Sequence, residues 1–328
     1  MTSSADAFHN LPDLAARLLG GSVIWADDEF FAPRQNLINP GDPDFTKGTF
    51  SHTGQVYDGW ETRRRRDGGG HDSAIVRLGA PGVVYGVVVD TAWFKGNYPT
   101  EISVEGARIP GYPSVEEVLA AEWTPLVPRS TAFGDTKNDY SVSDRGTYTH
   151  VRLSIYPDGG VARLRVHGVA RPDPDLLELG PVDLAALENG ASVSGCSNRF
   201  FSSPDNLLLP GRGRTMGEGW ETARRRDSGN DWVSVQLAAH GTVHMAELDT
   251  THFLGNAPGH ASLSGRDGNG PWFELLPKQR LQADCRHRFA VPVDTPVTEV
   301  RLDVYPDGGM LRMRLWGGLT EQGRASLR

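Results

Sequence analysis

Most of the sequence occurs twice along the chain. The segment DGWETRRRR at residues 58–66 returns as EGWETARRR at 218–226. The segment at 90–99 returns at 249–258 with the same Asp-Thr, Phe, Gly-Asn and Pro, and YPDGG at 156–160 returns at 305–309. A period this long indicates a duplicated domain, because solenoid units span only ~20–50 residues. Polar residues kept in both copies are therefore candidates for a shared task.

The offset between the copies falls along the chain and so marks where loops were shortened. It is 170 residues at Phe30, 160 at Trp60 and 149 at Trp123. The shortened stretches are polar or rich in Gly and Pro, which is typical of surface loops. Two domains follow, residues 1–170 and 171–328, each close to the usual size of ~150 residues.

Composition narrows the class of protein. The chain has 328 residues and a net charge of −8, and 38% of its residues are hydrophobic, which is enough for two packed cores. No apolar stretch approaches ~18 residues, so no membrane span is predicted. Residues 1–10 lack the basic and apolar regions of a secretory signal, which predicts a cytoplasmic protein. Cys196 and Cys285 both lie in the second copy, which favours reduced thiols over a disulfide.

Both copies are expected to be mainly β. Short apolar runs at 74–78 and 83–89 are typical of strands, and the runs at 151–156 and 161–167 around Pro-Asp-Gly-Gly predict a hairpin. In the second run of that hairpin, apolar and polar residues alternate, which predicts one buried face and one solvent or site face. The buried face would hold Ala162, Leu164 and Val166, and in the second copy Leu311, Met313 and Leu315. The other face would hold Arg163, Arg165 and His167, and in the second copy Arg312, Arg314 and Trp316.

Helical signal is limited to residues 11–19, 114–121 and 183–188. Ser114 followed by Glu117 predicts a capping box at the second of these. Short strands, many Gly and Pro residues and little helix favour a β-sandwich in each copy. The expected fold class is all-β: a tandem duplicated β-sandwich with few short helices. We expect a jelly roll rather than an immunoglobulin-like topology.

The arginine run at 63–66 is the first candidate for function. Nucleic acid is a poor partner for it, because the chain is acidic and has no basic tail. Two readings remain: a charged edge strand that resists aggregation, and an anion site, since arginine binds carboxylates in bidentate fashion. Arg64 and Arg65 recur in the second copy while Arg63 becomes Ala223, which favours the anion site. If the stretch is extended, Glu61, Arg63 and Arg65 share one face.

Two further segments carry polar residues. The loop at 90–99 follows an apolar strand, and it is either an Asx or Thr turn or a loop that presents side chains to a ligand. The segment at 70–72 contains His71, which could titrate near neutrality or lie idle on the surface, and Asp72. In the second copy Asp72 is kept as Asp231, whereas Asn230 replaces His71.

Together these motifs resemble the allantoicase (allantoate amidinohydrolase) family. The resemblance rests on GWETRR at 59–64, GHD at 70–72 and the 90–99 loop, and on GWET at 219–222, GNDWV at 229–233 and DTTHF at 249–253. It extends from Leu11 to Gly317. It implies a tandem jelly roll of the galactose-binding-domain-like kind and a homo-oligomer, with a hexamer as the expected size. Ala223 and Leu254 depart from the family pattern, so a full site in the second copy stays open.

The resemblance also implies a reaction, in which allantoate and water give ureidoglycolate and urea during purine (allantoin) catabolism. Urea leaves intact, so the bond that breaks joins the central aminal carbon to nitrogen. This requires a general acid for the leaving nitrogen, a base for water and a clamp for the carboxylate. Carboxylates beside arginine are normally ionised, so the acid is His71 or a carboxyl made neutral by desolvation.

Site residues follow from these requirements in each copy. The expected catalytic residues are Glu61, His71, Asp72 and Asp90. The expected substrate-binding residues are Arg64, Arg65, Trp93, Lys95 and Asn97. The equivalents in the second copy are Glu221, Arg224, Arg225, Asp231, Asp249, His252 and Asn256. Whether one copy, both, or their interface holds the site stays open.

No cofactor is expected. The chain has no CxxC, HExxH or histidine-rich pattern, although a divalent cation on Asp and Glu oxygens stays open. The alternatives to an enzyme are a tandem β-sandwich that binds carbohydrate through its eight tryptophans, and an inactive family member. The absence of a secretory signal and the clustering of acid and base residues with arginine favour the enzyme.

Overall fold

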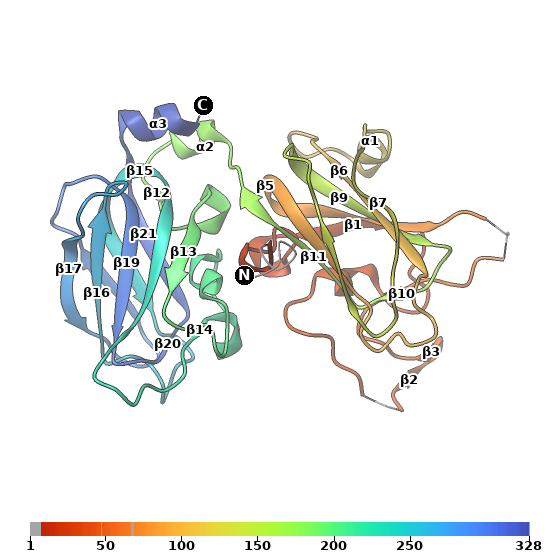
Figure 1. Cartoon of the computed structure of the whole chain (residues 1–328), viewed down its shortest axis with the longest axis horizontal. Helices are drawn as coiled ribbons and strands as arrows, with labels where there is room; N and C mark the ends of the chain where they lie inside the picture. The colour runs from red at the N-terminus through yellow and green to blue at the C-terminus, as the bar shows by residue number, and fades with distance from the viewer. Residues whose placement is uncertain (1–7, 47, 67–68, 328) are drawn as a thin grey trace. The chain divides into compact units, whose positions relative to one another are not determined.

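The computed structural model describes residues 8–46, 48–66 and 69–327. Most of the N-terminal segment on which the cytoplasmic prediction rests (residues 1–7) lies outside the described residues. The chain separates into two compact units, residues 1–171 and 172–328, called unit one and unit two below (Figure 1). Each unit is a β-sandwich, which confirms the expected all-β tandem fold with few short helices.

The strands of unit one are β1 (Ser22–Ala26), β2 (Phe50–Ser51), β3 (Gly54–Gln55), β4 (Trp60–Glu61), β5 (Asp72–Asp90), β6 (Glu101–Ala107), β7 (Thr124–Thr131), β8 (Lys137–Ser141), β9 (Thr147–Tyr156), β10 (Gly160–Val161) and β11 (Arg163–Ala170). Its helices are the 3-10 turns η1 (Phe8–Asn10), η2 (Arg17–Leu19) and η3 (Arg34–Ile38), and the α-helix α1 (Val115–Leu119).

The long strand β5 belongs to both sheets of unit one. Its first half pairs with β1 and β9, and its second half pairs with β11 and β8. The register with β9 shifts between Arg77 and Gly82, and the strand crosses there from one sheet to the other. β6 and β7 extend the first sheet beyond β9, in the order β1-β5-β9-β6-β7.

Because β5 turns a corner, its two ends return to one edge of the sandwich. Asp72 at its start is opposite Ile155, and Asp90 at its end is opposite Arg163. Only the short turn 156–162 separates those two partners, and β10 within it pairs with β4. The segments that repeat in the sequence therefore meet at this edge, which we call the motif edge.

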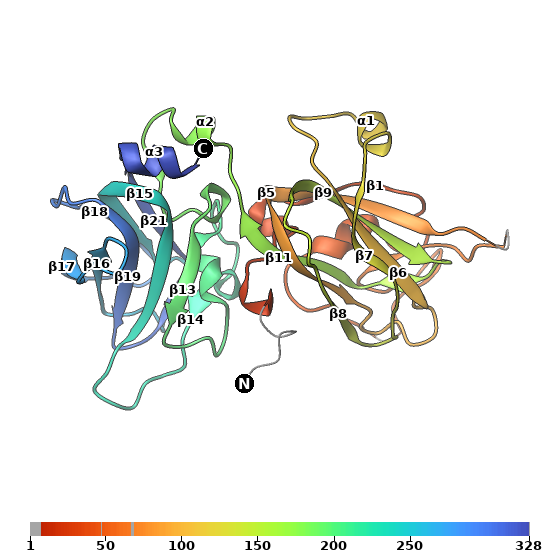
Figure 2. The ribbon, with the colours of Figure 1, turned by 45° about the horizontal axis from the view of Figure 1, so that its top comes forward.

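Unit two repeats this plan (Figure 2). Its strands are β12 (Val182–Asp183), β13 (Ser192–Cys196), β14 (Trp220–Glu221), β15 (Asp231–Asp249), β16 (His260–Arg266), β17 (Phe273–Arg280), β18 (Arg286–Ala290), β19 (Val297–Tyr305), β20 (Gly309–Met310) and β21 (Arg312–Leu319). Its helices are α2 (Pro174–Leu177), η4 (Leu187–Asn189), η5 (Pro204–Leu208), η6 (Met216–Glu218) and α3 (Glu321–Leu327). β15 takes the place of β5: Asp231 is opposite Val304, and Asp249 is opposite Arg312.

The predicted hairpin is wrong. β9 and β11 do not pair with each other, because β9 lies against the first half of β5 and β11 against its second half. The Pro-Asp-Gly-Gly turn therefore connects the two sheets, and its Gly160 and Val161 pair with β4 instead. The turn chemistry was recognised, but a turn between two sheets and a turn within one sheet have the same sequence signature.

One of the three expected helices is confirmed. α1 begins after Ser114, whose side chain and that of Glu117 form both bonds of the capping box. The helices expected at 11–19 and 183–188 are wrong, since only the short 3-10 turns η2 and η4 form there. The backbone of the first segment is used by β11 instead, because Leu14 N donates to Val166 O (2.8 Å).

The alternation along residues 162–167 and 311–316 is confirmed on the apolar side, where all six apolar residues are fully buried. The opposite face is only partly open to solvent. Arg163, Arg312 and Arg314 are buried, Arg165 and His167 are half-buried, and Trp316 is exposed. Segments η3 and η5 cover that face in the two units. Arg163 is paired there with Asp58 (2.5 Å), and burial lowers the pKa of Arg312 to about 10.

Cys196 and Cys285 are free thiols, as expected. Among the described residues, no helix is long and apolar enough to cross a membrane.

Large aromatic side chains are buried at the motif edge of each unit. Trp60 and Trp220 are fully buried, and so are Phe94 and Phe253 of the loops that follow β5 and β15. A Cβ placed on Gly309 would overlap the ring of Phe253. Glycine is therefore required at this position by close approach rather than by turn geometry.

We expect Gly309→Ala to lower the free energy of unfolding of unit two by ~1–3 kcal/mol, the usual cost of overpacking a core. Gly318→Ala is the matched control, because a Cβ there meets no atom within 4 Å. Urea unfolding followed by tryptophan fluorescence measures both variants. Equal stability of the two would contradict the packing argument.

Candidate functional site

A glutamate and an asparagine form a pair at the motif edge of each unit. Asn97 Nδ2 donates to Glu61 Oε1 at 2.6 Å, and Asn256 Nδ2 donates to Glu221 Oε1 at 2.6 Å. The glutamates lie in β4 and β14, and the asparagines lie in the loops after β5 and β15. Burial raises the pKa of the Glu61 carboxyl, and the bond from Asn97 partly offsets this. The two pairs have the same geometry, so the duplication preserved a specific contact.

The loop that carries each asparagine is fixed by the Pro-Asp-Gly-Gly turn. Gly160 N donates to Asn97 O at 2.7 Å, and Gly309 N donates to Asn256 O at 2.8 Å. These backbone bonds tie the loop after the long strand to the turn between the sheets. The amide side chain is therefore held in place before any ligand binds.

Arg65 and Arg225 hold the edge together. Their backbone N–H groups donate to Asp158 and Asp307 of the turns, each at 2.7 Å. The guanidinium of Arg65 contacts Asp72 at 2.5 Å, and that of Arg225 contacts Asp231 at 2.9 Å. A single side chain thus joins the glutamate segment, the turn and the start of the long strand.

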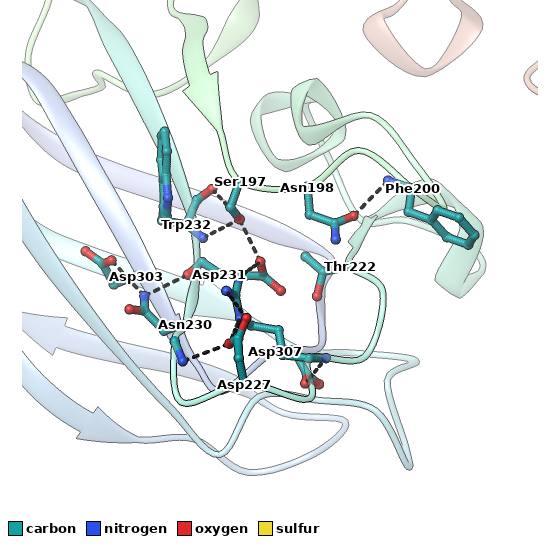
Figure 3. A network of polar contacts seen from close by, with 12 residues as sticks. Ser197, Asn198, Phe200, Thr222, Asp227, Asn230, Asp231, Trp232, Asp303 and Asp307 are labelled. Atoms are coloured by element: carbon teal, nitrogen blue, oxygen red, sulfur yellow. Dashed lines mark hydrogen bonds and ion pairs between the residues drawn. The ribbon is translucent and has the colours of Figure 1, made fainter.

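Asp231 is the centre of this network in unit two. It is fully buried, and it accepts hydrogen bonds from Arg225 and from Ser197 Oγ (2.8 Å). Figure 3 shows Asp231 between Ser197 and Asp227, and Asp227 itself accepts from Arg225 at 3.0 Å. These contacts give Asp231 and Arg225 a structural task.

Arg64 and Arg224 differ from their neighbours. Both are exposed, and neither has a hydrogen bond or an ion pair within the part of the chain that the structure describes. The strand ends at Glu61 in unit one and at Glu221 in unit two. The arginines therefore follow the strand, and successive arginines take different roles: Arg63 and Arg65 form ion pairs with Asp28 and Asp72, whereas Arg64 is exposed.

A cavity of about 420 Å³ opens at the motif edge of unit two, which is within the usual range for small-molecule sites. It combines the glutamate–asparagine pair with the exposed arginine, one aromatic side chain and the turn. Its lining residues are Phe201, Glu221, Thr222, Arg224, Arg225, Gly255, Asn256, Ala257, Pro306, Asp307 and Gly308.

Asp249 lies outside this lining, and Asp90 is its equivalent at the end of β5 in unit one. Asp90 Oδ1 accepts from Ala92 N at 2.8 Å, and Asp249 Oδ1 accepts from Thr251 N at 2.9 Å. Both are buried, and burial raises the pKa of Asp90. This is the Asx turn that the sequence offered as the alternative to catalysis.

The other expected residues of the loops after β5 and β15 also contact residues outside the glutamate–asparagine pair. Trp93 Nε1 donates to Pro43 O at 3.1 Å, and His252 Nε2 lies 3.1 Å from Gly213 O. Lys95 Nζ is exposed and lies 3.6 Å from Asp135. None of the three contacts the glutamate–asparagine pair in the described chain.

His71 lies beside the Arg65–Asp72 pair. Its carbonyl accepts from Arg65 Nη1 at 2.7 Å, and its exposed ring lies 5.0 Å from the ring of Tyr156. In unit two Asn230 takes this place and donates to Asp303 at 2.8 Å. The position therefore faces the sheet of β9 or β19 rather than the asparagine.

Sequence reasoning missed three kinds of residue at this edge. Asp158 and Asp307 anchor the arginine backbone, Thr222 bonds Gly308, and Phe201 lines the cavity. A signal existed for each, because YPDGG, GWET and the Phe-Phe pair all occur in both copies. Within the described residues, no group of three or more His, Cys, Asp or Glu side chains could hold a metal ion.

The comparisons with known proteins agree with this duplicated geometry. The family model described as "Allantoicase repeat" matches residues 12–171 and again 182–320. The chain belongs to the allantoicase family. A probable allantoicase of Nocardia farcinica is 59% identical, with 95% of each chain covered. A probable allantoicase of Streptomyces avermitilis is 50% identical, with 98% of this chain and 89% of the relative covered.

A solved structure supports the same assignment. The crystal structure of allantoicase from Saccharomyces cerevisiae has a TM-score of 0.84 to this chain at 34% identity, and 96% and 98% of the two chains are covered. Allantoicases are hydrolases that act on carbon–nitrogen bonds, so the chain is a hydrolase rather than the non-catalytic binding module considered as an alternative.

We expect Arg225→Ala to lower the midpoint of thermal unfolding, because it leaves the buried Asp231 carboxylate without its cation. Arg224→Ala is the matched control: it removes a neighbouring guanidinium that is exposed and has no hydrogen bond or ion pair among the described residues. Calorimetry compares the two variants with the parent protein. Equal midpoints for both would show that Arg225 does not brace the edge.

Proposed function

We propose that the protein hydrolyses allantoate to ureidoglycolate and urea in purine catabolism, and that the motif edge of each unit holds an active site. Membership of the allantoicase family supports the reaction. One observation supports the location. In both units a half-buried glutamate is paired with an asparagine, beside an exposed arginine that has no hydrogen bond or ion pair among the described residues.

Arg64 and Arg224 are the proposed clamps for the substrate carboxylate. The guanidinium groups of Arg65 and Arg225 already bind Asp72 and Asp231, which argues against a second anion there. An exposed arginine can instead offer a planar pair of N–H donors to a carboxylate. The substrate's negative charge would thus be held next to the glutamate without displacing a buried ion pair.

Glu61 and Glu221 are the proposed proton donors. Burial raises the pKa of Glu61, so a larger fraction of this carboxyl carries a proton than in an exposed glutamate. The proton goes to the leaving ureido nitrogen, the bond from the central carbon to that nitrogen breaks and urea leaves, and the lone pair of the second ureido nitrogen forms a C=N bond to give an iminium ion. Water then adds to the central carbon and returns a proton to the carboxylate.

Asn97 and Asn256 are proposed to position the glutamate and the substrate together. One N–H of each amide binds the carboxyl, and the second N–H of Asn97 can donate to a ureido carbonyl. Asn256 Nδ2 also lies 3.2 Å from Met216 Sδ, a weak acceptor that a ureido carbonyl would replace. The structural contacts of Asp72, Asp90, Trp93, Lys95 and of their equivalents argue for supporting roles. His71 stays the alternative acid in unit one, but unit two has no equivalent histidine.

The assembly and its setting belong to the same proposal. A homo-oligomer, with a hexamer as the expected size, and a cytoplasmic location stay predictions. Neither nucleic acid nor a membrane is an expected partner.

We expect Glu61→Gln combined with Glu221→Gln to reduce allantoate turnover by roughly 10²–10⁴-fold, the usual contribution of a general acid. Glutamine keeps an oxygen for the asparagine, so the fold is retained. Urea release measures turnover, and each single variant reports one unit. Activity of the parent protein should survive a chelator. Near parental turnover in the double variant would refute the assignment, and absence of urea from the parent would favour the inactive family member.

The pH dependence follows from the same carboxyl. A general acid works only while protonated, so turnover by unit one should fall as pH rises through the raised pKa of Glu61. We would record kcat against pH in Glu221→Gln, which leaves unit one active, and in His71→Asn of that variant. A falling limb that persists without His71 supports Glu61, whereas its disappearance assigns the acid to His71.

A further inference from the structure

Each unit exposes a pair of adjacent phenylalanines at the motif edge. Phe30 and Phe31 are 51% and 38% exposed, and Phe200 and Phe201 are 73% and 61% exposed. In each pair the two rings meet edge to face at 87°, with centroids 5.1 Å apart in unit one and 4.7 Å apart in unit two. Large apolar side chains that stay exposed in both copies indicate a contact surface rather than a part of the core.

The backbone that carries these rings is bonded to the glutamate segment. Phe31 N donates to Glu61 O at 3.3 Å, and Glu61 N donates back to Ala32 O at 3.3 Å. In unit two Glu221 N donates to Ser202 Oγ at 2.8 Å. The aromatic pair is thus held in register with the proposed acid.

A second bond fixes the start of each aromatic segment. The buried Trp60 donates through Nε1 to Asp28 O at 2.7 Å, and Trp220 donates to Asn198 O at 2.9 Å. In Figure 3 the Asn198 side chain in turn accepts from Phe200 N–H, at 2.9 Å. The frame is the same in both units, although the side chains at 28 and 198 differ.

One ring of the pair faces the cavity. Phe201 lines it together with Glu221, Arg224 and Asn256. Its neighbour Phe200 is absent from the lining and touches Phe201 edge to face, so it limits how far that ring can turn. The cavity therefore has one apolar planar wall among polar groups.

We propose that Phe201, and Phe31 in unit one, are specificity residues on which the retained ureido group of the substrate stacks. This inference rests on the proposed function. The carboxylate is taken by the arginine and the leaving ureido group by the glutamate, so a second planar ureido group needs a surface of its own. A ureido group has an exposed π face, and an aromatic ring binds such a face while it excludes water. Stacking would also fix the plane of the nitrogen that supplies electrons to the iminium ion.

The test compares Phe31→Ala/Phe201→Ala with the parent protein. We expect KM for allantoate to rise roughly tenfold while kcat changes less. Binding of ureidoglycolate, which keeps one ureido group, should weaken by a similar factor in calorimetry. Inhibition by glycolate, which has the carboxylate but no ureido group, should stay unchanged. Phe31→Leu/Phe201→Leu should recover only part of the affinity, because leucine is apolar but has no planar face.

Phe50→Ala is the matched control, since Phe50 is 69% exposed and lies in β2, outside the cavity lining. Unchanged KM and ureidoglycolate binding in the double alanine variant would overturn the proposal. A fall in oligomer mass by light scattering with unchanged ligand binding would instead make the pair a subunit contact, and also overturns it. Loss of glycolate and ureidoglycolate binding alike would mean that the rings support the arginine rather than a ureido group. If the parent protein neither releases urea nor binds ureidoglycolate, the proposed function itself fails.

Discussion

The corner in the long central strand is the constraint on which the rest of each unit depends. β5 and β15 each serve two sheets, so the residues at their two ends are far apart in sequence but return to one edge. The positions of the other segments of the site depend on the two strand ends lying at the same edge. The turn 156–162 can bond both the glutamate strand and the asparagine loop only because the strand brings its own ends together.

Two adjacent arginines at the motif edge of each unit have different roles. Arg65 and Arg225 are internal braces whose charge is balanced by buried aspartates, and removing either partner would leave a charge without compensation. Arg64 and Arg224 sit one residue earlier and are directed to solvent. The contacts of Arg65 and Arg225 fix the backbone next to Arg64 and Arg224, whose exposed guanidinium groups remain available to a ligand.

The sequence predicted the all-β fold and, because both copies keep them, named Glu61 and Asn97 as candidate site residues, but it did not predict that the two pair. It did not predict the sheet crossing, since a Pro-Asp-Gly-Gly turn has the same residues within a sheet and between two sheets. The buried arginines of β11 and β21 were also missed, because alternation indicates two faces but not what covers the second one. The sequence also did not predict that Arg65 is paired while Arg64 is exposed. That difference arises because the folded chain brings Asp72, seven residues later in the sequence, into contact with Arg65.

All residues of each glutamate–asparagine–arginine cluster come from a single unit. Each unit therefore contains the residues of one complete cluster, and the duplication gave the chain a second one. Either copy can then accumulate changes while the other is kept by selection. Ala223 and Leu254, both in unit two, are substitutions that such redundancy would tolerate.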